Sequence, residues 1–240
     1  AVPAHASFTK GYQVNDMALL SNYRLLEVVN PYGNAFAHWD MALSNGHRVY
    51  AIGDDDTHDI TQASEVCRNM TMINSADLEP EHIYEALDKG LCYAVEFDNW
   101  YHHPMTLEEK AKQAKGLPHL TRAEVVGDTL FIKTSADKMQ EVKFVGQDGK
   151  VLKTEENVET ACYVIQPDDP YVRTEINVNG LQHYYLNPVT RHPAPEPEDQ
   201  RLDVINEAQT YLYWFVYVVA FVALGWYLFK KAKEKKQGDE

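Results

Sequence analysis

The first half of the chain alternates between two hydrophobic periods. Leu25–Val29 and Val49–Ile52 are short apolar runs typical of buried strands, and residues 35–44 between them repeat apolar side chains with the period of a helix. Gly46 follows that segment, where glycine commonly ends helices. Strand, helix and strand in this order, with polar residues where the strands end, predict part of an α/β barrel.

The alternation continues toward residue 118. Residues 70–74 and 91–97 have the composition of strands, and residues 75–89 between them have the pattern of a helix. Thr106 and Glu109 fit a capping box, which predicts a further, polar helix. We therefore assign residues 1–118 to a partial β/α barrel, with its sites at the carboxyl ends of the strands.

Beyond residue 118 the pattern becomes one of short strands. A Gly127-Asp128 turn separates two apolar runs, and further strand-like segments follow at near-regular spacing, at residues 142–145, 162–165 and 171–178. This spacing predicts a small β-sandwich over residues 119–192. The fold class expected for the chain is therefore α/β, with an appended β module.

The last apolar segment predicts a membrane anchor. Tyr211–Phe229 has no charged residue over nineteen positions, and at about 1.5 Å per residue it spans roughly 28 Å, close to the thickness of a bilayer core. The alternative is a buried core helix. We predict a transmembrane helix over residues 210–229, in contact with membrane lipid, after a Pro-rich acidic linker over residues 193–209.

Charge predicts the orientation of the anchor and excludes one class of partner. Residues 230–240 carry five lysines, which places the C-terminus in the cytoplasm and the preceding domains outside it, in the periplasm if the cell is bacterial. The net charge of −14 argues against nucleic acid as a partner, because binding to phosphates depends on Lys and Arg. Three cysteines without a CxxC spacing do not predict a disulfide framework.

The candidate chemistry lies directly after the second apolar run. Asp54-Asp55-Asp56-Thr57-His58 contains an Asp-x-His pair at the expected mouth of a strand, and carboxylate and imidazole are both good ligands for divalent metals. The alternative is a solvated acidic turn. In the metal interpretation, Asp56 and His58 are ligands, whereas Asp54 and Asp55 orient ligands.

Several of these segments together resemble the later half of the PHP (polymerase and histidinol phosphatase) superfamily. The resemblance covers about residues 1–192, and the segments that carry it are Pro3–Ala6, Leu26–Asn30, Trp39-Asp40, Asp55–His58, Tyr171–Glu175 and Asn187-Pro188. It implies a distorted β/α barrel that binds up to three divalent metal ions (zinc, manganese or iron) and hydrolyses phosphoesters. It also implies that His5, at the end of an opening strand, ligates metal together with Asp56 and His58.

Two functions follow from the resemblance. The first is a membrane-anchored, exported metal-dependent phosphoesterase that acts on a small phosphoester. The family's opening His-x-His motif belongs to the first half of its barrel, so we expect activity only where an N-terminal half or a partner protein completes the site. The second is a catalytically degenerate structural or interaction subunit of a larger membrane complex.

Four further side chains have the residue types of site residues but can be explained by structure. Arg173 can pair with Glu175, two residues along the same strand face, or bind phosphate. Trp39, at helical spacing, is expected in the core. The adjacent His102 and His103 point to opposite faces of an extended segment, so we expect surface positions rather than a shared metal.

Overall fold

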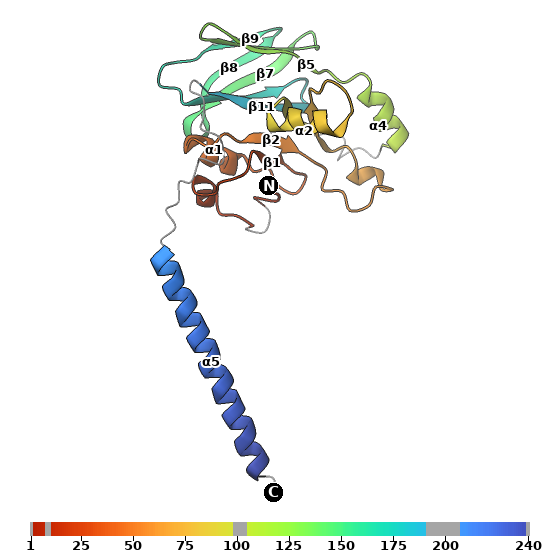
Figure 1. The fold of residues 1–240 in the computed structure, drawn as a ribbon. Helices are drawn as coiled ribbons and strands as arrows, with labels where there is room; N and C mark the ends of the chain where they lie inside the picture. Colours follow the sequence, from red (N-terminus) through yellow and green to blue (C-terminus); the bar gives the residue numbers. More distant parts are fainter. Residues whose placement is uncertain (1, 8–10, 98–104, 191–206, 239–240) are drawn as a thin grey trace. The chain divides into compact units, whose positions relative to one another are not determined.

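A computed structural model describes residues 2–7, 11–97, 105–190 and 207–238. The chain divides into two compact units, Ala1–Gln200 and Arg201–Glu240. The described strands form three sheets, all within the first unit (Figure 1).

A six-stranded sheet forms the middle of the first unit. Its strand order is β3-β4-β11-β10-β7-β8, and every neighbouring pair is antiparallel. The strands are β3 (Asn69–Ile73), β4 (Cys92–Phe97), β11 (Gln182–Thr190), β10 (Tyr171–Asn177), β7 (Met139–Gly146) and β8 (Lys150–Val158). The sheet therefore joins strands from both sides of residue 118.

One face of this sheet is covered by a β-α-β layer. β1 (Leu25–Val29) pairs in parallel with β2 (Tyr50–Gly53), and α1 (Phe36–Ser44) connects them, in agreement with the apolar pattern. Trp39 of α1 is fully buried, as expected, in a core that also contains Tyr185 of the six-stranded sheet.

The other face is covered by a three-stranded sheet. β5 (Leu120–Val126), β6 (Thr129–Thr134) and β9 (Ala161–Val164) pair in the order β5-β6-β9, and the Gly127-Asp128 turn joins the first two, as expected. Tyr184 is buried in this second core, next in sequence to Tyr185 in the first, because alternate side chains of a strand point to opposite faces. The unit consequently has three layers with two separate cores (Figure 1).

The expected α/β class with a partial β/α barrel is wrong, because the described strands of the first unit form a β-rich fold of three sheets. A barrel of that type needs parallel strands joined by crossover helices, and β1–β2 is the single parallel pair among the described strands. β3 and β4 flank a helix but pair antiparallel. Hydrophobic period identified these elements correctly, but it carries no information on the direction in which strands pair.

A smaller expectation near the N-terminus is also corrected. Residues 2–4 do not form the expected opening strand, although the carbonyl of Pro3 accepts a hydrogen bond from the Glu27 N–H of β1 (3.2 Å). A 3₁₀ helix, η2 (Val14–Ala18), precedes β1 in the chain.

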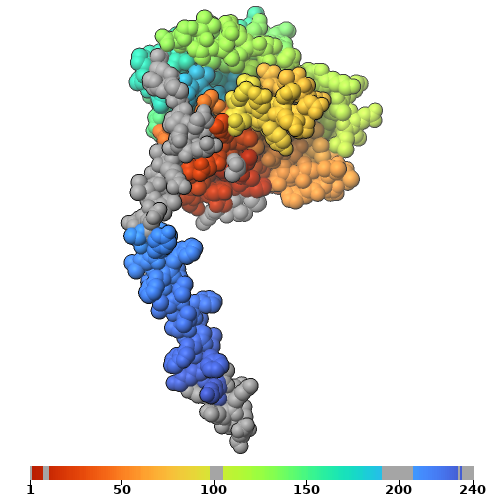
Figure 2. Space-filling view, in the orientation of Figure 1, coloured from red at the N-terminus to blue at the C-terminus, as the bar shows by residue number. Residues whose placement is uncertain are grey.

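The remaining helices of the first unit lie at its periphery. α2 (Pro80–Asp88) is mostly exposed, and Figure 2 shows this segment at the surface in yellow. α4 (Leu107–Ala114) begins with the capping box expected at Thr106 and Glu109. Two further 3₁₀ turns are η3 (Ala63–Glu65) and η4 (Gln147–Gly149).

The second unit contains one long helix, α5 (Glu207–Gly238). Its segment Ala208–Lys231 has 24 residues and a mean hydropathy of 1.9, which makes it long and apolar enough to cross a membrane. None of that segment is buried, so the alternative of a buried core helix has no support within the unit. Most of the expected linker, residues 193–209, lies outside the described residues.

Candidate metal centre

The site forms where the two parallel strands end. Glu27 lies within β1, and Asp54 directly follows β2, with its N–H donating to the carbonyl of Val29 at 3.2 Å. The side chain of Glu27 is almost fully buried, although the residue lies in an otherwise apolar strand. Parallel pairing brings these two carboxylates to the same edge of the layer.

The N-terminal segment supplies an imidazole to the same place. His5 Nδ1 lies 3.7 Å from Asp56 Oδ2, and the His5 N–H donates to Glu27 Oε2 at 2.5 Å. His5 and Asp56, two of the three expected ligands, are therefore neighbours in the folded chain. We call His5, Glu27, Asp54 and Asp56 the His5 cluster.

Electrostatics within the His5 cluster favour a bound proton or cation. Partial burial and, to a smaller extent, the charge of Glu27 together raise the pKa of Asp54 from its ordinary value of 3.8 to about 6. The side chains of Asp54 and Glu27 share a hydrogen bond, which also raises this pKa because one of the two carboxyl groups must be protonated to donate. The His5 cluster therefore holds three carboxyl groups beside one imidazole, and one of these carboxyl groups holds its proton more tightly than usual.

A tight turn separates Asp56 from the last expected ligand. Asp54 Oδ1 accepts a hydrogen bond from the Asp56 N–H (3.0 Å), and Asp56 has a φ of +47°, in the left-handed region that Asp tolerates better than most residues. His58, beyond the turn, is exposed, and its N–H donates to Glu65 Oε2 at 3.1 Å. The structure thus gives His58 surroundings that differ from those of His5 and Asp56.

Asp55 organises the following loop. Its carboxylate accepts hydrogen bonds from three consecutive backbone N–H groups, those of Cys67 (2.5 Å), Arg68 (2.5 Å) and Asn69 (2.8 Å). Arg68 Nη2 donates in return to the backbone carbonyl of Asp55 (2.6 Å). These bonds attach the acidic run to the start of β3, so Asp55 supports the shape of the run rather than facing a ligand.

Sequence reasoning missed Glu27 and the polar side chains around it. Asn30 donates to Glu27 Oε1, while Asn34 Nδ2 lies 3.2 Å from Glu96 Oε2, which also accepts from the hydroxyl of Tyr185 at 2.8 Å. The signal in the sequence was a single charged residue inside the apolar run Leu25–Val29. A buried charge in a strand requires a partner, and this could have marked Glu27 as a site residue.

The donor set of the His5 cluster suits a divalent metal. Carboxylates and imidazole are the ligands that zinc, manganese and iron use in proteins. As arranged, no three His, Cys, Asp or Glu side chains of the described residues converge on one metal position. Glu27 instead binds Asn30 and the His5 N–H, so a metal would replace hydrogen bonds that now satisfy these oxygens.

Arg173 is fully engaged in the core. It forms the expected pair with Glu175 (Nη1–Oε1 2.5 Å) and a bidentate pair with Asp40 at 2.7 and 2.8 Å. Its guanidinium lies 5.0 Å from the ring centroid of Trp39. These contacts occupy the donors that phosphate would need. The other histidine candidates, His102 and His103, lie outside the described residues.

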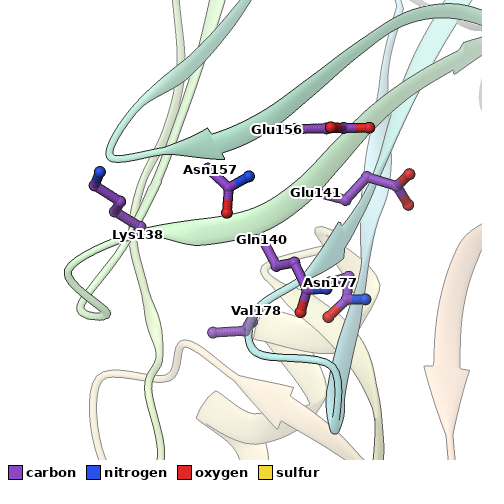
Figure 3. A pocket seen from close by; sticks show the side chains of 7 residues that line it. All are labelled: Lys138, Gln140, Glu141, Glu156, Asn157, Asn177 and Val178. Atoms are coloured by element: carbon purple, nitrogen blue, oxygen red, sulfur yellow. The ribbon is translucent and has the colours of Figure 1, made fainter.

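A separate polar groove of about 480 Å³ lies on β7, β8 and β10 (Figure 3). Glu141 of β7 is the cross-strand neighbour of Glu156 on β8 and of Asn177 on β10. Lys143 Nζ lies 2.7 Å from Glu141 Oε1 and balances part of this charge. The groove shares no residue with the His5 cluster, and exposed carboxylates and amides alone do not define a ligand.

Comparison with protein-family models, with curated proteins and with solved structures finds no match to this chain.

Proposed function

We propose that the chain is a membrane-anchored, metal-dependent phosphoester hydrolase in which the His5 cluster holds a divalent ion. The observation that carries this proposal is the proximity of His5 and Asp56 beside two further carboxyl groups, one with its pKa raised to about 6. A divalent cation would favour the ionised form of this carboxyl group, which burial and the charge of Glu27 now disfavour. Because the first unit is a three-layer domain and not part of a β/α barrel, the proposal rests on the His5 cluster itself and not on completion of a barrel by a further half.

The residues of the His5 cluster have distinct roles in this proposal. His5 and Asp56 hold the ion, and Glu27 and Asp54 supply additional oxygens. Asn30, hydrogen-bonded to Glu27, fixes the direction of that carboxylate. The bound ion supplies Lewis acidity toward a phosphoryl oxygen and lowers the pKa of water, which are the two contributions that phosphoester hydrolysis needs.

Hydrolysis of a generic phosphoester tests the proposal. The full chain in lipid nanodiscs is freed of metal, supplied with Mn²⁺ or Zn²⁺, and assayed with p-nitrophenyl phosphate and bis(p-nitrophenyl) phosphate. We expect metal-dependent release of nitrophenol that falls at least about tenfold in Asp56→Asn, because loss of a ligand weakens the site. His82 and Asp77, an exposed pair at 2.7 Å, provide the matched control variants His82→Gln and Asp77→Asn.

A second function, that of an interaction subunit, has one observation in its favour. The oxygens of Glu27 and Asp55 are already satisfied by hydrogen bonds within the described residues. Such a subunit would bind no metal with or without its partners. If the chain is such a subunit, native mass spectrometry of the solubilised protein should show a complex heavier than the 27.4 kDa of the chain. If the chain is the hydrolase, the spectrum should show the chain with bound metal.

We propose that the first unit lies outside the cytoplasm, since lysines follow the apolar segment Ala208–Lys231. A membrane-impermeant maleimide should then label a Gln237→Cys variant in a cysteine-free background only after the cells are opened. Labelling of intact cells would reverse the orientation.

A further inference from the structure

A second cavity, distinct from the His5 cluster, opens between the six-stranded and three-stranded sheets. Its volume is about 650 Å³, within the range of small-molecule sites. Its lining comes from β2, β3, β4, β5, β6, β10 and β11 and the loops beside them. We call it the inter-sheet cleft.

Aliphatic side chains line much of the inter-sheet cleft. Leu130 and Leu186 belong to the buried core. Met72, Ile73 and Leu91 also line the cleft but are 37%, 37% and 47% exposed. Apolar surface that remains open to water in a concave site favours an apolar ligand, because its burial releases that surface from water.

Two irregularities of strand pairing border the cleft. The register of β5 against β6 shifts between Leu120 and Arg122, and the register of β10 against β11 shifts between Val172 and Thr174. Each shift places one or more unpaired residues at the cleft, and bulges of this kind bend strands locally. Both irregularities therefore lie among the residues that line the cleft.

The charge of the cleft is opposite to that of the chain. Of 240 residues 36 are acidic, yet none of the 22 residues lining the cleft is Asp or Glu. Three lining residues are cationic: Arg48, Lys89 and Arg122. An apolar cavity that excludes acidic residues and gathers cations suits a ligand with an apolar body and an anionic group.

Two of the three cations, Arg48 and Lys89, remain available to a ligand. The guanidinium of Arg122 instead pairs with Glu124 at 2.7 Å and lies over the ring of Phe131, 4.4 Å from its centroid, on the strand face opposite to Leu130 and Ile132. Lys89 pairs with Glu85 at 2.5 Å, but both side chains are more than half exposed, and such a surface pair contributes little free energy. Arg48 is exposed and lies over the ring of Tyr50, 5.7 Å from its centroid. A ligand anion can therefore replace these surface partners at low cost.

We propose that the inter-sheet cleft binds an anionic amphiphile, a long-chain carboxylate or alkyl phosphate, with its chain against the aliphatic lining and its head group at Arg48 and Lys89. A chain with a membrane-spanning segment is held near a source of such molecules. This site is independent of the proposed hydrolase, because it shares no residue with the His5 cluster.

Photo-crosslinking tests this site. The full chain in phosphatidylcholine nanodiscs is irradiated with a diazirine-bearing fatty acid, and the labelled positions are mapped by mass spectrometry. We expect labels concentrated at residues 72–74, 91–93 and 120–123, and competition by dodecanoate or dodecyl phosphate but not by dodecanol. The stronger of the two anionic competitors identifies the head group.

Variants distinguish binding that depends on the cationic side chains from unspecific partitioning of the probe onto apolar surface. The double variant Arg48→Gln/Lys89→Gln should reduce labelling at least about fivefold, consistent with loss of charge-assisted contacts. Lys138→Gln, in the polar groove, should leave it unchanged. Thermal unfolding by circular dichroism verifies that each variant folds. Labels spread over the whole surface, equal competition by dodecanol, or full labelling of a folded double variant would each overturn the proposal.

Discussion

Asp54 titrates at a higher pH in the folded chain than it does unfolded. Its pKa rises from 3.8 to about 6, because burial and the charge of Glu27 oppose ionisation. The folded state therefore binds this proton more tightly than the unfolded state. The resulting stabilisation is complete below about pH 4 and is lost as the pH rises through 6.

Replacing this carboxyl group should remove the pH dependence. Asp54→Asn keeps an oxygen that can accept the hydrogen bond from the Asp56 N–H, but it cannot ionise. We expect the variant to unfold at a higher temperature than the wild type above pH 6, with the difference vanishing near pH 4. Circular dichroism melts between pH 4 and 7 measure this, with exposed Asp137→Asn as control. Parallel curves for Asp54→Asn and wild type would refute the assignment.

Arg173 and Asp40 form the most deeply buried ion pair described in the chain. Asp40→Ala leaves the guanidinium with Glu175 as its remaining carboxylate, and we expect a loss of about 3–5 kcal/mol in the free energy of unfolding. Removal of Glu141, from a half-exposed pair with Lys143, should cost less than about 1 kcal/mol. Urea titrations compare the two, and equal losses would show that burial of the Arg173 pair contributes nothing.

The sequence predicted part of the candidate site at this scale. His5 and Asp56 were proposed as ligands and are neighbours, separated by 3.7 Å. Glu27 was missed, because four of the five residues of β1 are apolar and this majority predicts a buried strand without indicating a role for the one charged residue. The metal itself remains a prediction, since no observation on the folded chain tests it.

At the scale of elements, periodicity predicted what forms but not how it pairs. β1, α1 and β2 follow their apolar patterns closely. β4 pairs in antiparallel fashion with β3 and also with β11, which lies about 90 residues later in the chain. No local pattern carries that information, so the barrel expected from the order of elements was wrong.

The side chain of Asn187, in β11, makes long-range hydrogen bonds that join β11 to β2 and β4. Its Oδ1 accepts from the Ala51 N–H of β2 (2.8 Å), and its Nδ2 donates to the carbonyls of Gly90 (3.0 Å) and Cys92 (2.8 Å). Asn187→Ala leaves three backbone groups without this partner, and we expect a loss of at least about 2 kcal/mol in the free energy of unfolding.

The control for Asn187 is Asn45→Ala, because the exposed Asn45 amide bonds only within its own helix end at Met41. The Asn45→Ala variant should lose less than about 1 kcal/mol in the free energy of unfolding. Chemical denaturation of both variants provides the comparison. A loss at Asn187 no larger than that at Asn45 would show that this side chain does not join the layers.

At the scale of the whole molecule, the proposed function requires both units of the chain, a three-layer domain and an apolar helix. The helix could be predicted from composition alone, because a bilayer imposes length and hydropathy on any span. The layers could not, because they depend on which strand faces pack together. Within the domain, the His5 cluster and the inter-sheet cleft share no residue and can be tested separately.

Binding of Mn²⁺ by the His5 cluster is the central claim, and electron paramagnetic resonance of the full chain in nanodiscs tests it most directly. We expect saturable Mn²⁺ binding whose affinity falls at least about tenfold in His5→Gln and in Asp56→Asn, while His82→Gln and Asp77→Asn retain the wild-type affinity. Equally weak Mn²⁺ binding by the wild type and all four variants would contradict the account.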